Sequence, residues 1–100
     1  MNNDIKILSL LNGQELIAEI QREDLNQIEL IHPFLFFLEM ERSTNNPKLG
    51  LIPYGPLVDG NILINKNMII YIANPKEMLL TAYRQSTGKI ITHRKELIVG

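Results

Sequence analysis

Two apolar segments with a two-residue period flank Asn12-Gly13 near the start of the chain. Residues 5–11 form the first, whose mostly apolar face would carry Ile5, Ile7, Ser9 and Leu11. Residues 14–23 form the second, and their pattern places Leu16, Ala18 and Ile20 on the inward face. A period of two is typical of half-buried strands, and Asn-Gly supplies the positive φ angles that tight hairpin turns require. The sequence therefore predicts an antiparallel β-hairpin.

Further strands are predicted along the chain, separated by turn signals. The polar residues 24–27 form the next turn, and a long apolar segment begins at Ile28. Pro33 within it predicts a bend or an edge position, because proline cannot donate to a strand ladder. After a polar loop at 43–48, residues 49–57 return as an extended segment. A meander of at least five strands closes most economically as a small barrel, which removes exposed strand edges.

One helix is predicted after the strands, at about residues 75–87. Asn74 suits its N-cap, Glu77 completes a capping-box spacing, and Gly88 suits its end. Its buried stripe would consist of two pairs, Met78 with Ala82 and Leu79 with Tyr83. The tail, 89–100, is strand-like but mixed in composition. We interpret residues 1–100 as a single domain, with the barrel at about 5–73.

The composition limits the classes of protein to which the chain can belong. One hundred residues, of which 45% are apolar, suffice for one core of modest stability, which favours assembly into something larger. The chain has no cysteine, and His32 and His93 lie far apart, so we expect no disulfide, metal site or cofactor. The apolar stretches are too short for a membrane helix, which favours a cytoplasmic protein. The net charge of −1 makes any nucleic-acid contact a local one.

No pattern of residues indicates catalysis. Glu23 and Asp24 are adjacent, and Glu39 and Glu41 share one face of a strand, as solvated residues do. His32 lies within an apolar strand, where a structural histidine is expected. Because no nucleophile, glycine-rich phosphate loop or metal-spaced cluster accompanies these residues, we do not expect an enzyme.

Two stretches resemble the signatures of the Sm, LSm and Hfq superfamily. Residues 10–30, LLNGQELIAEIQREDLNQIEL, resemble the first signature in their Asn-Gly, in the small residue midway along a strand, and in the Asp before a polar turn. Residues 62–72, ILINKNMIIYI, resemble the second, in which Ile-Arg-Gly-Asn precedes a final apolar strand. Residues 50–57 and 74–90 further resemble the Sm-like proteins of phages of marine bacteria.

The resemblance implies a mainly β fold: a small, strongly bent, five-stranded antiparallel Sm-like (SH3-like) barrel, here with a C-terminal α-helix in place of the family's N-terminal helix. It also implies a homo-oligomeric ring of about five to seven subunits, in which strand four of one subunit pairs with strand five of the next. The residues expected at this subunit interface are Ile62, Ile64, Ile69 and Tyr71. Such a ring would act in the cytoplasm, which is the host cytoplasm if the protein is phage-encoded.

In Sm-like rings, the turn after the Asp and the turn of the second signature lie together at the pore rim and bind single-stranded, often uridine-rich RNA. The matching residues here are Asp24, Asn26, Gln27, Asn65, Lys66 and Asn67. The polar interruption at 65–67 is then a turn between two strands. One Lys66 per subunit would give such a ring a positive collar.

One departure from the family bears on RNA binding. Leu25, Asn26 and Gln27 follow Asp24, so the family's base-stacking aromatic residue is missing. Stacking contributes about 1–3 kcal/mol per base, and its loss weakens the case for RNA. Two interpretations stay open: a non-catalytic RNA chaperone or adaptor, and a structural or protein-interaction ring whose rim carries ordinary turn residues.

Overall fold

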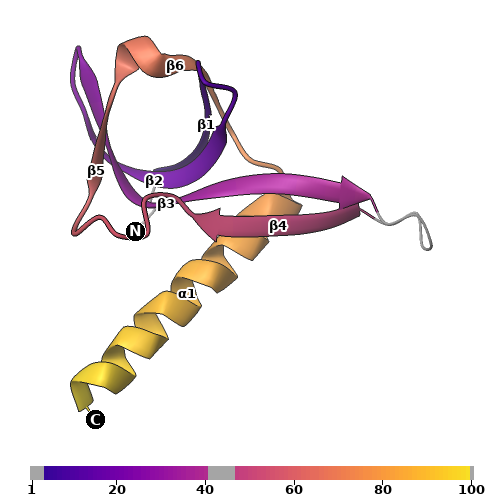
Figure 1. Cartoon of the computed structure of the whole chain (residues 1–100), viewed down its shortest axis with the longest axis vertical. Helices are drawn as coiled ribbons and strands as arrows, with labels where there is room; N and C mark the ends of the chain where they lie inside the picture. The colour runs from indigo at the N-terminus through magenta and orange to yellow at the C-terminus, as the bar shows by residue number, and fades with distance from the viewer. Residues whose placement is uncertain (1–3, 41–46, 100) are drawn as a thin grey trace.

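The computed structural model describes residues 4–40 and 47–99 and shows a mainly β structure with a C-terminal helix (Figure 1). The predicted fold class is therefore confirmed. The elements in chain order are β1 (Asp4–Leu10), β2 (Glu15–Glu23), β3 (Gln27–Met40), β4 (Pro47–Pro53), β5 (Ile62–Asn65), the short 3-10 helix η1 (Lys66–Met68), β6 (Ile69–Ala73) and α1 (Glu77–Val99).

The β1–β2 hairpin forms where Asn12-Gly13 predicts it. Gly13 has a φ of 89°, and its N–H donates to the carbonyl oxygen of Leu10 at 3.0 Å. The side chain of Asn12 accepts the N–H of Gln14, also at 3.0 Å. Glycine adopts a positive φ without steric cost, so the turn is determined by residues that are neighbours in the sequence.

β3 is the longest strand and connects two parts of the sheet. The sheet order is β4-β3-β2-β1-β6, and β5 also pairs with β3. Residues 27–30 of β3 pair with β5, whereas residues 34–40 pair with β4. Between these parts His32 has a φ of 49° and Pro33 follows, so the predicted bend is confirmed. β5 pairs with the part of β3 before this bend and β4 with the part after it, and the sheet has six strands where at least five were predicted.

In the segment between β3 and β5, two boundaries in the structure differ from the predicted ones. The extended segment expected at 49–57 ends at Pro53, and the loop that follows contains Gly55 and Gly60, with φ of 67° and 88°. Most of the polar loop predicted at 43–48 lies outside the described residues, and its last two residues already belong to β4.

The sheet curls strongly, so that β6, β1, β2 and β5 surround a common interior (Figure 1). β6 ends one side of the sheet, and β5 pairs with β3 alone. Among the described residues no ladder joins β5 to β6, and η1 connects them instead. These pairings show a curled antiparallel sheet whose edge strands are β4, β5 and β6, and they leave its closure into a barrel a prediction.

Part of each face of the sheet is buried, by different partners. Inside the curl, one cluster contains Leu8, Leu10, Leu16, Ala18, Ile28, Leu30 and Ile64. On the outer face, Ile17 and Phe34 pack against Leu79 and Tyr83 of α1. Each fully buried aliphatic side chain contributes about 1.5–3 kcal/mol, so both clusters stabilise the fold. Leu11, expected on the apolar face of the first strand, lies beyond β1 and is 60% exposed.

α1 packs on the sheet through its first turns. Leu79 and Tyr83 are buried, which confirms one predicted pair, whereas Met78 of the other pair is 57% exposed. The Tyr83 hydroxyl donates towards the carbonyl oxygens of Ile31 and His32, at 3.1 and 3.0 Å. Burial raises the pKa of Tyr83 above its ordinary value, so the hydroxyl remains a donor. Tyr83 thereby fastens the helix to the bend of β3.

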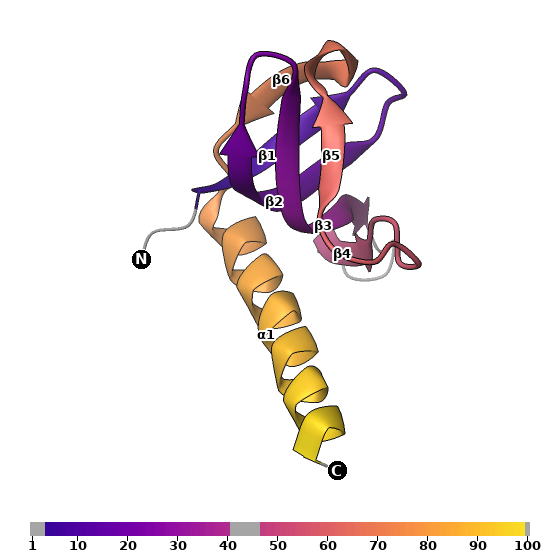
Figure 2. The same cartoon turned by 90° about the vertical axis from the view of Figure 1, so that its left-hand side faces the viewer.

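The predicted ends of the helix are wrong. The helix begins at Glu77, and the side-chain oxygen of Asn74 accepts a hydrogen bond from the Lys6 ammonium instead of capping it. It continues through Gly88 to Val99, so the tail predicted as strand-like at 89–100 is helical up to residue 99. A strand needs a neighbouring strand to satisfy its backbone groups, whereas a helix satisfies them internally, and this helix projects away from the sheet (Figure 2).

Candidate nucleic-acid interface

The structure brings together the two turns predicted to bind RNA. One turn joins β2 to β3, and the other contains η1 and joins β5 to β6. The N–H of Lys66 donates to the carbonyl oxygen of Asn26 at 2.8 Å, and Gln27 pairs with Asn65 across β3 and β5. The six predicted residues lie in these two turns and are called the rim below: Asp24, Asn26, Gln27, Asn65, Lys66 and Asn67.

Asp24 shapes its own turn. Its Oδ1 accepts the backbone N–H groups of Asn26 and Gln27, both at 2.8 Å. These hydrogen bonds are the main reason why the pKa of Asp24 is lowered from its ordinary value, and the charge of Lys66 acts in the same direction. The carboxylate is thus occupied by the turn, as expected of an ordinary turn residue.

We expect Asp24→Ala to reduce the stability of the fold at neutral pH and to have less effect in acid. The pKa of this carboxyl group is lower in the folded state than in the unfolded chain. Its stabilisation is therefore present above the unfolded pKa of about 3.9 and is lost as the pH falls through the lower folded pKa. Urea unfolding of the wild type and the variant across this pH range measures the effect. A difference between them that stays constant into strong acid would contradict this role for Asp24.

Asn65 explains why the last apolar stretch is interrupted by three polar residues. Its side-chain oxygen accepts the N–H of Asn67 at 2.9 Å and caps η1. At the other end of η1, the N–H of Ile69 donates to the carbonyl oxygen of Lys66. The chain changes direction within this single turn while its backbone groups remain paired. The turn predicted between the two strands is confirmed.

Lys66 is paired with a carboxylate. Its Nζ lies 2.7 Å from Oε2 of Glu23, at the end of β2, and the two side chains are 32% and 49% exposed. Asp24 follows Glu23, and beside them Arg22 lies 3.9 Å from Glu29. Three of these five charged residues are acidic, so this part of the surface has no net positive charge. The positive charge expected from Lys66 is therefore offset within the chain itself.

Three amide side chains of the rim are open to a ligand. Asn26, Gln27 and Asn67 are exposed, and within the described part of the chain no hydrogen bond involves their side-chain atoms. Amides can donate to and accept from the edges of bases. Beside the rim is a hollow of about 300 Å³, lined by Arg22, Glu23, Asp24, Gln27, Glu29, Asn61 and Leu63.

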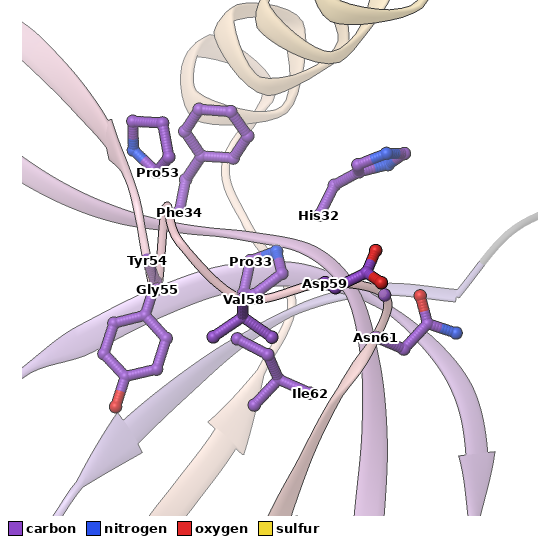
Figure 3. A pocket seen from close by; sticks show the side chains of 11 residues that line it. His32, Pro33, Phe34, Pro53, Tyr54, Gly55, Val58, Asp59, Asn61 and Ile62 are labelled. Atoms are coloured by element: carbon purple, nitrogen blue, oxygen red, sulfur yellow. The ribbon is translucent and has the colours of Figure 1, made fainter.

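A second hollow, of about 560 Å³, lies at the bend of β3 (Figure 3). Its apolar walls include Pro33, Val58 and Ile62, and its polar groups come from His32, Asp59 and Asn61. The Asn61 amide donates to Oε2 of Glu29 at 2.8 Å. His32 is partly buried, and its backbone carbonyl oxygen accepts a hydrogen bond from Tyr83.

The predicted interface residues divide between the core and the surface. Ile64 is 8% exposed and belongs to the inner cluster, against which Ile62 and Ile69 also pack. Ile64 thus lies in the core of the chain itself, which corrects the expectation that it faces a neighbour. Ile62 and Ile69 are partly buried and pack against that core, and their place at an interface stays a prediction. Tyr71 is 46% exposed, and its hydroxyl donates to Oε2 of Glu15 at 2.7 Å. This hydrogen bond raises the pKa of Tyr71.

The apolar side chains that β5 and β6 leave exposed are different from those predicted. Leu63 of β5 is 58% exposed, and Ile70 and Ile72 of β6 are 59% and 42% exposed. These three side chains are called the edge patch below; Tyr71 projects from the opposite face of β6, because it pairs with Ser9 whereas Ile72 pairs with Leu8. Sequence reasoning assigned the opposite side chains of these strands because the alternation alone does not say which face is covered from within. It missed the pairing of Glu23 with Lys66 because these residues are distant in the sequence.

Comparison with known proteins provides no relative from which a function could be inferred. No family model matches the chain, and no curated protein is similar to it. In residues 4–40 and 47–99, no helix combines the length and apolar character needed to cross a membrane. In the same part of the chain, no three acidic or histidine side chains are grouped so that they could hold a metal ion.

Proposed function

We propose that the chain assembles into a homo-oligomeric, Sm-like ring of about five to seven subunits, and that the rim binds single-stranded RNA as a non-catalytic chaperone or adaptor in the cytoplasm. The observation that carries the proposal is that the rim lies beside two edge strands, β5 and β6, which expose the apolar side chains of Leu63, Ile70 and Ile72. An unpaired strand edge beside exposed apolar side chains favours pairing with another chain.

The two edges suit a head-to-tail contact. β5 of one subunit would add to β6 of the next, so that backbone hydrogen bonds provide affinity and the edge patch is covered. A head-to-tail contact that uses different surfaces on the two partners generates a ring when its rotation closes. Because η1 connects β5 to β6, each contact would bring two copies of the rim close together around one opening.

The chemistry of the rim supports single-stranded RNA as the ligand. The amides of Asn26, Gln27 and Asn67 would read base edges, and Lys66 would contact the phosphate backbone. A ring repeats these contacts, so that contacts which are weak in one subunit add up along a strand that spans several. No step of this function needs a catalytic group or a cofactor.

A second candidate is a structural or protein-interaction ring that does not bind RNA. The observation that favours it is the ion pair of Lys66 with Glu23, which offsets the charge of the rim. The missing aromatic residue after Asp24 favours it as well.

Titration with short uridine-rich and adenine-rich oligonucleotides, on rings whose mass is known from light scattering, separates the two functions. Saturable, salt-sensitive binding near micromolar concentrations supports the RNA ring, and its absence supports the structural one.

Two substitutions in η1 should affect binding differently. Lys66→Ala should weaken oligonucleotide binding and flatten its salt dependence, because one phosphate contact per subunit is lost. Asn67→Ala should change the preference between uridine and adenine more than the salt dependence, because an amide reads base edges. Both side chains lie in a surface turn, so each variant should keep its stability within about 0.5 kcal/mol. Fluorescence anisotropy at several salt concentrations measures both effects, and identical behaviour of the two variants would contradict these roles.

A further inference from the structure

Glu23 forms an ion pair with Lys66, the residue of the rim that would otherwise contact a phosphate. Its Oε2 lies 2.7 Å from Nζ of Lys66. Asp24 is less suited to this position, because its carboxylate already accepts two backbone N–H groups in its own turn. Glu23 is the last residue of β2, and its side chain is 49% exposed, so it can turn into solvent when another anion takes its place.

We propose that Glu23 is an internal competitor, a specificity residue that a ligand phosphate must displace from Lys66. This inference rests on the proposed function and names the ligand class more narrowly: RNA strands that contact several subunits at once, and not mononucleotides. A mononucleotide exchanges one exposed ion pair for another and gains little from the exchange. A strand that spans several subunits repeats the exchange at high effective concentration and adds contacts between bases and amides.

Glu23→Gln tests the competition, because glutamine keeps the shape of the side chain and removes its charge. We expect the variant to bind a short uridine oligonucleotide roughly fivefold more tightly than the wild type, since an exposed ion pair contributes up to about that factor. The affinity should also depend more steeply on salt, because the phosphate then neutralises Lys66 without releasing the carboxylate of Glu23 into solvent. In a Lys66→Ala background the gain should vanish, since the competitor acts only through that ammonium.

Glu39→Gln is the matched control. It removes the same charge from an exposed position near the opposite end of β3, and it should change the affinity less than about twofold because salt screens such a distance. Light scattering establishes that all variants assemble to the same mass. Uridine monophosphate serves as the second probe, and the wild type should bind it far more weakly than the oligonucleotide.

The outcomes distinguish this inference from the function on which it rests. The competitor role is overturned if Glu23→Gln raises the oligonucleotide affinity no more than Glu39→Gln does. It is also overturned if the rise in affinity persists in the Lys66→Ala background. If the wild type nevertheless binds the oligonucleotide, the RNA ring stands. Equal affinity of the wild type for monophosphate and oligonucleotide overturns the ligand class. No binding by any variant, on rings of confirmed mass, overturns both proposals.

Discussion

Tyr83→Ala should lower the free energy of unfolding by about 3–5 kcal/mol, which is the range for truncating a large aromatic residue in a core. Tyr83 is 2% exposed, and its ring lies edge-on to Phe34, with the centroids 5.9 Å apart. Its loss would leave a cavity between α1 and the outer face of the sheet. Urea unfolding at a fixed subunit concentration measures the change, since assembly makes apparent stability depend on concentration.

Tyr83→Phe separates the hydroxyl from the ring. This variant should lose about 1 kcal/mol, because the hydrogen bond to the bend of β3 disappears while the packing remains. Burial raises the pKa of Tyr83 above its ordinary value of 10.0, so the stabilisation from the neutral hydroxyl is complete below pH 10.0 and declines at higher pH. Tyr71→Phe, at an exposed position, is the control. Equal losses in both variants would contradict the role of Tyr83 as the fastener of the helix.

Ile70→Lys should convert the proposed ring into monomers. Ile70 is 59% exposed on the edge strand β6, so the substitution should leave the subunit folded. In an assembled ring, the same position would bury an ammonium group without a partner at every interface, and removing such a charge from water costs several kcal/mol. Multi-angle light scattering at micromolar concentration measures the mass, and far-UV circular dichroism verifies the fold.

Two further variants make this experiment decisive. Leu63→Lys alters the edge patch on β5 and should dissociate the ring in the same way, because a head-to-tail contact needs both edges. Leu57→Lys makes the same kind of change in the loop between β4 and β5, where the side chain is 97% exposed, and should leave the mass unchanged. An unchanged mass in both edge variants, or a wild type that is monomeric, would remove the ring from the proposal.

The ion pair of Glu23 with Lys66 changes how the rim is understood. In the sequence, Lys66 is a cation within a polar turn, and one copy per subunit suggests a surface that attracts phosphate. In the fold, the end of β2 places a carboxylate against it. In the proposed ring, binding of a phosphate to Lys66 would require Glu23 to give up its ion pair, so the affinity for single phosphates would be weak and ligands that reach several subunits would be favoured.

Local sequence determined those parts of the structure that depend on backbone conformation over a few residues. Asn12-Gly13 made the hairpin turn, Pro33 marked the bend of β3, and the polar residues at 65–67 made the turn before the last strand. The stripe of Leu79 and Tyr83 also followed from helical spacing. In each case the residues that cause the feature are neighbours in the chain, so their pattern is visible without knowledge of the fold.

Tertiary structure alone decided which faces are covered and which charges meet. The curl of the sheet, for example, places Ile64 in the core and packs Ile62 and Ile69 against it, although their alternation also fits an interface. Gly88 does not end α1, because a helix projecting from the sheet meets nothing that stops it, and a glycine inside a helix costs only about 1 kcal/mol. Burial and ion pairing depend on residues far apart in the chain, and only the folded sheet brings those residues together.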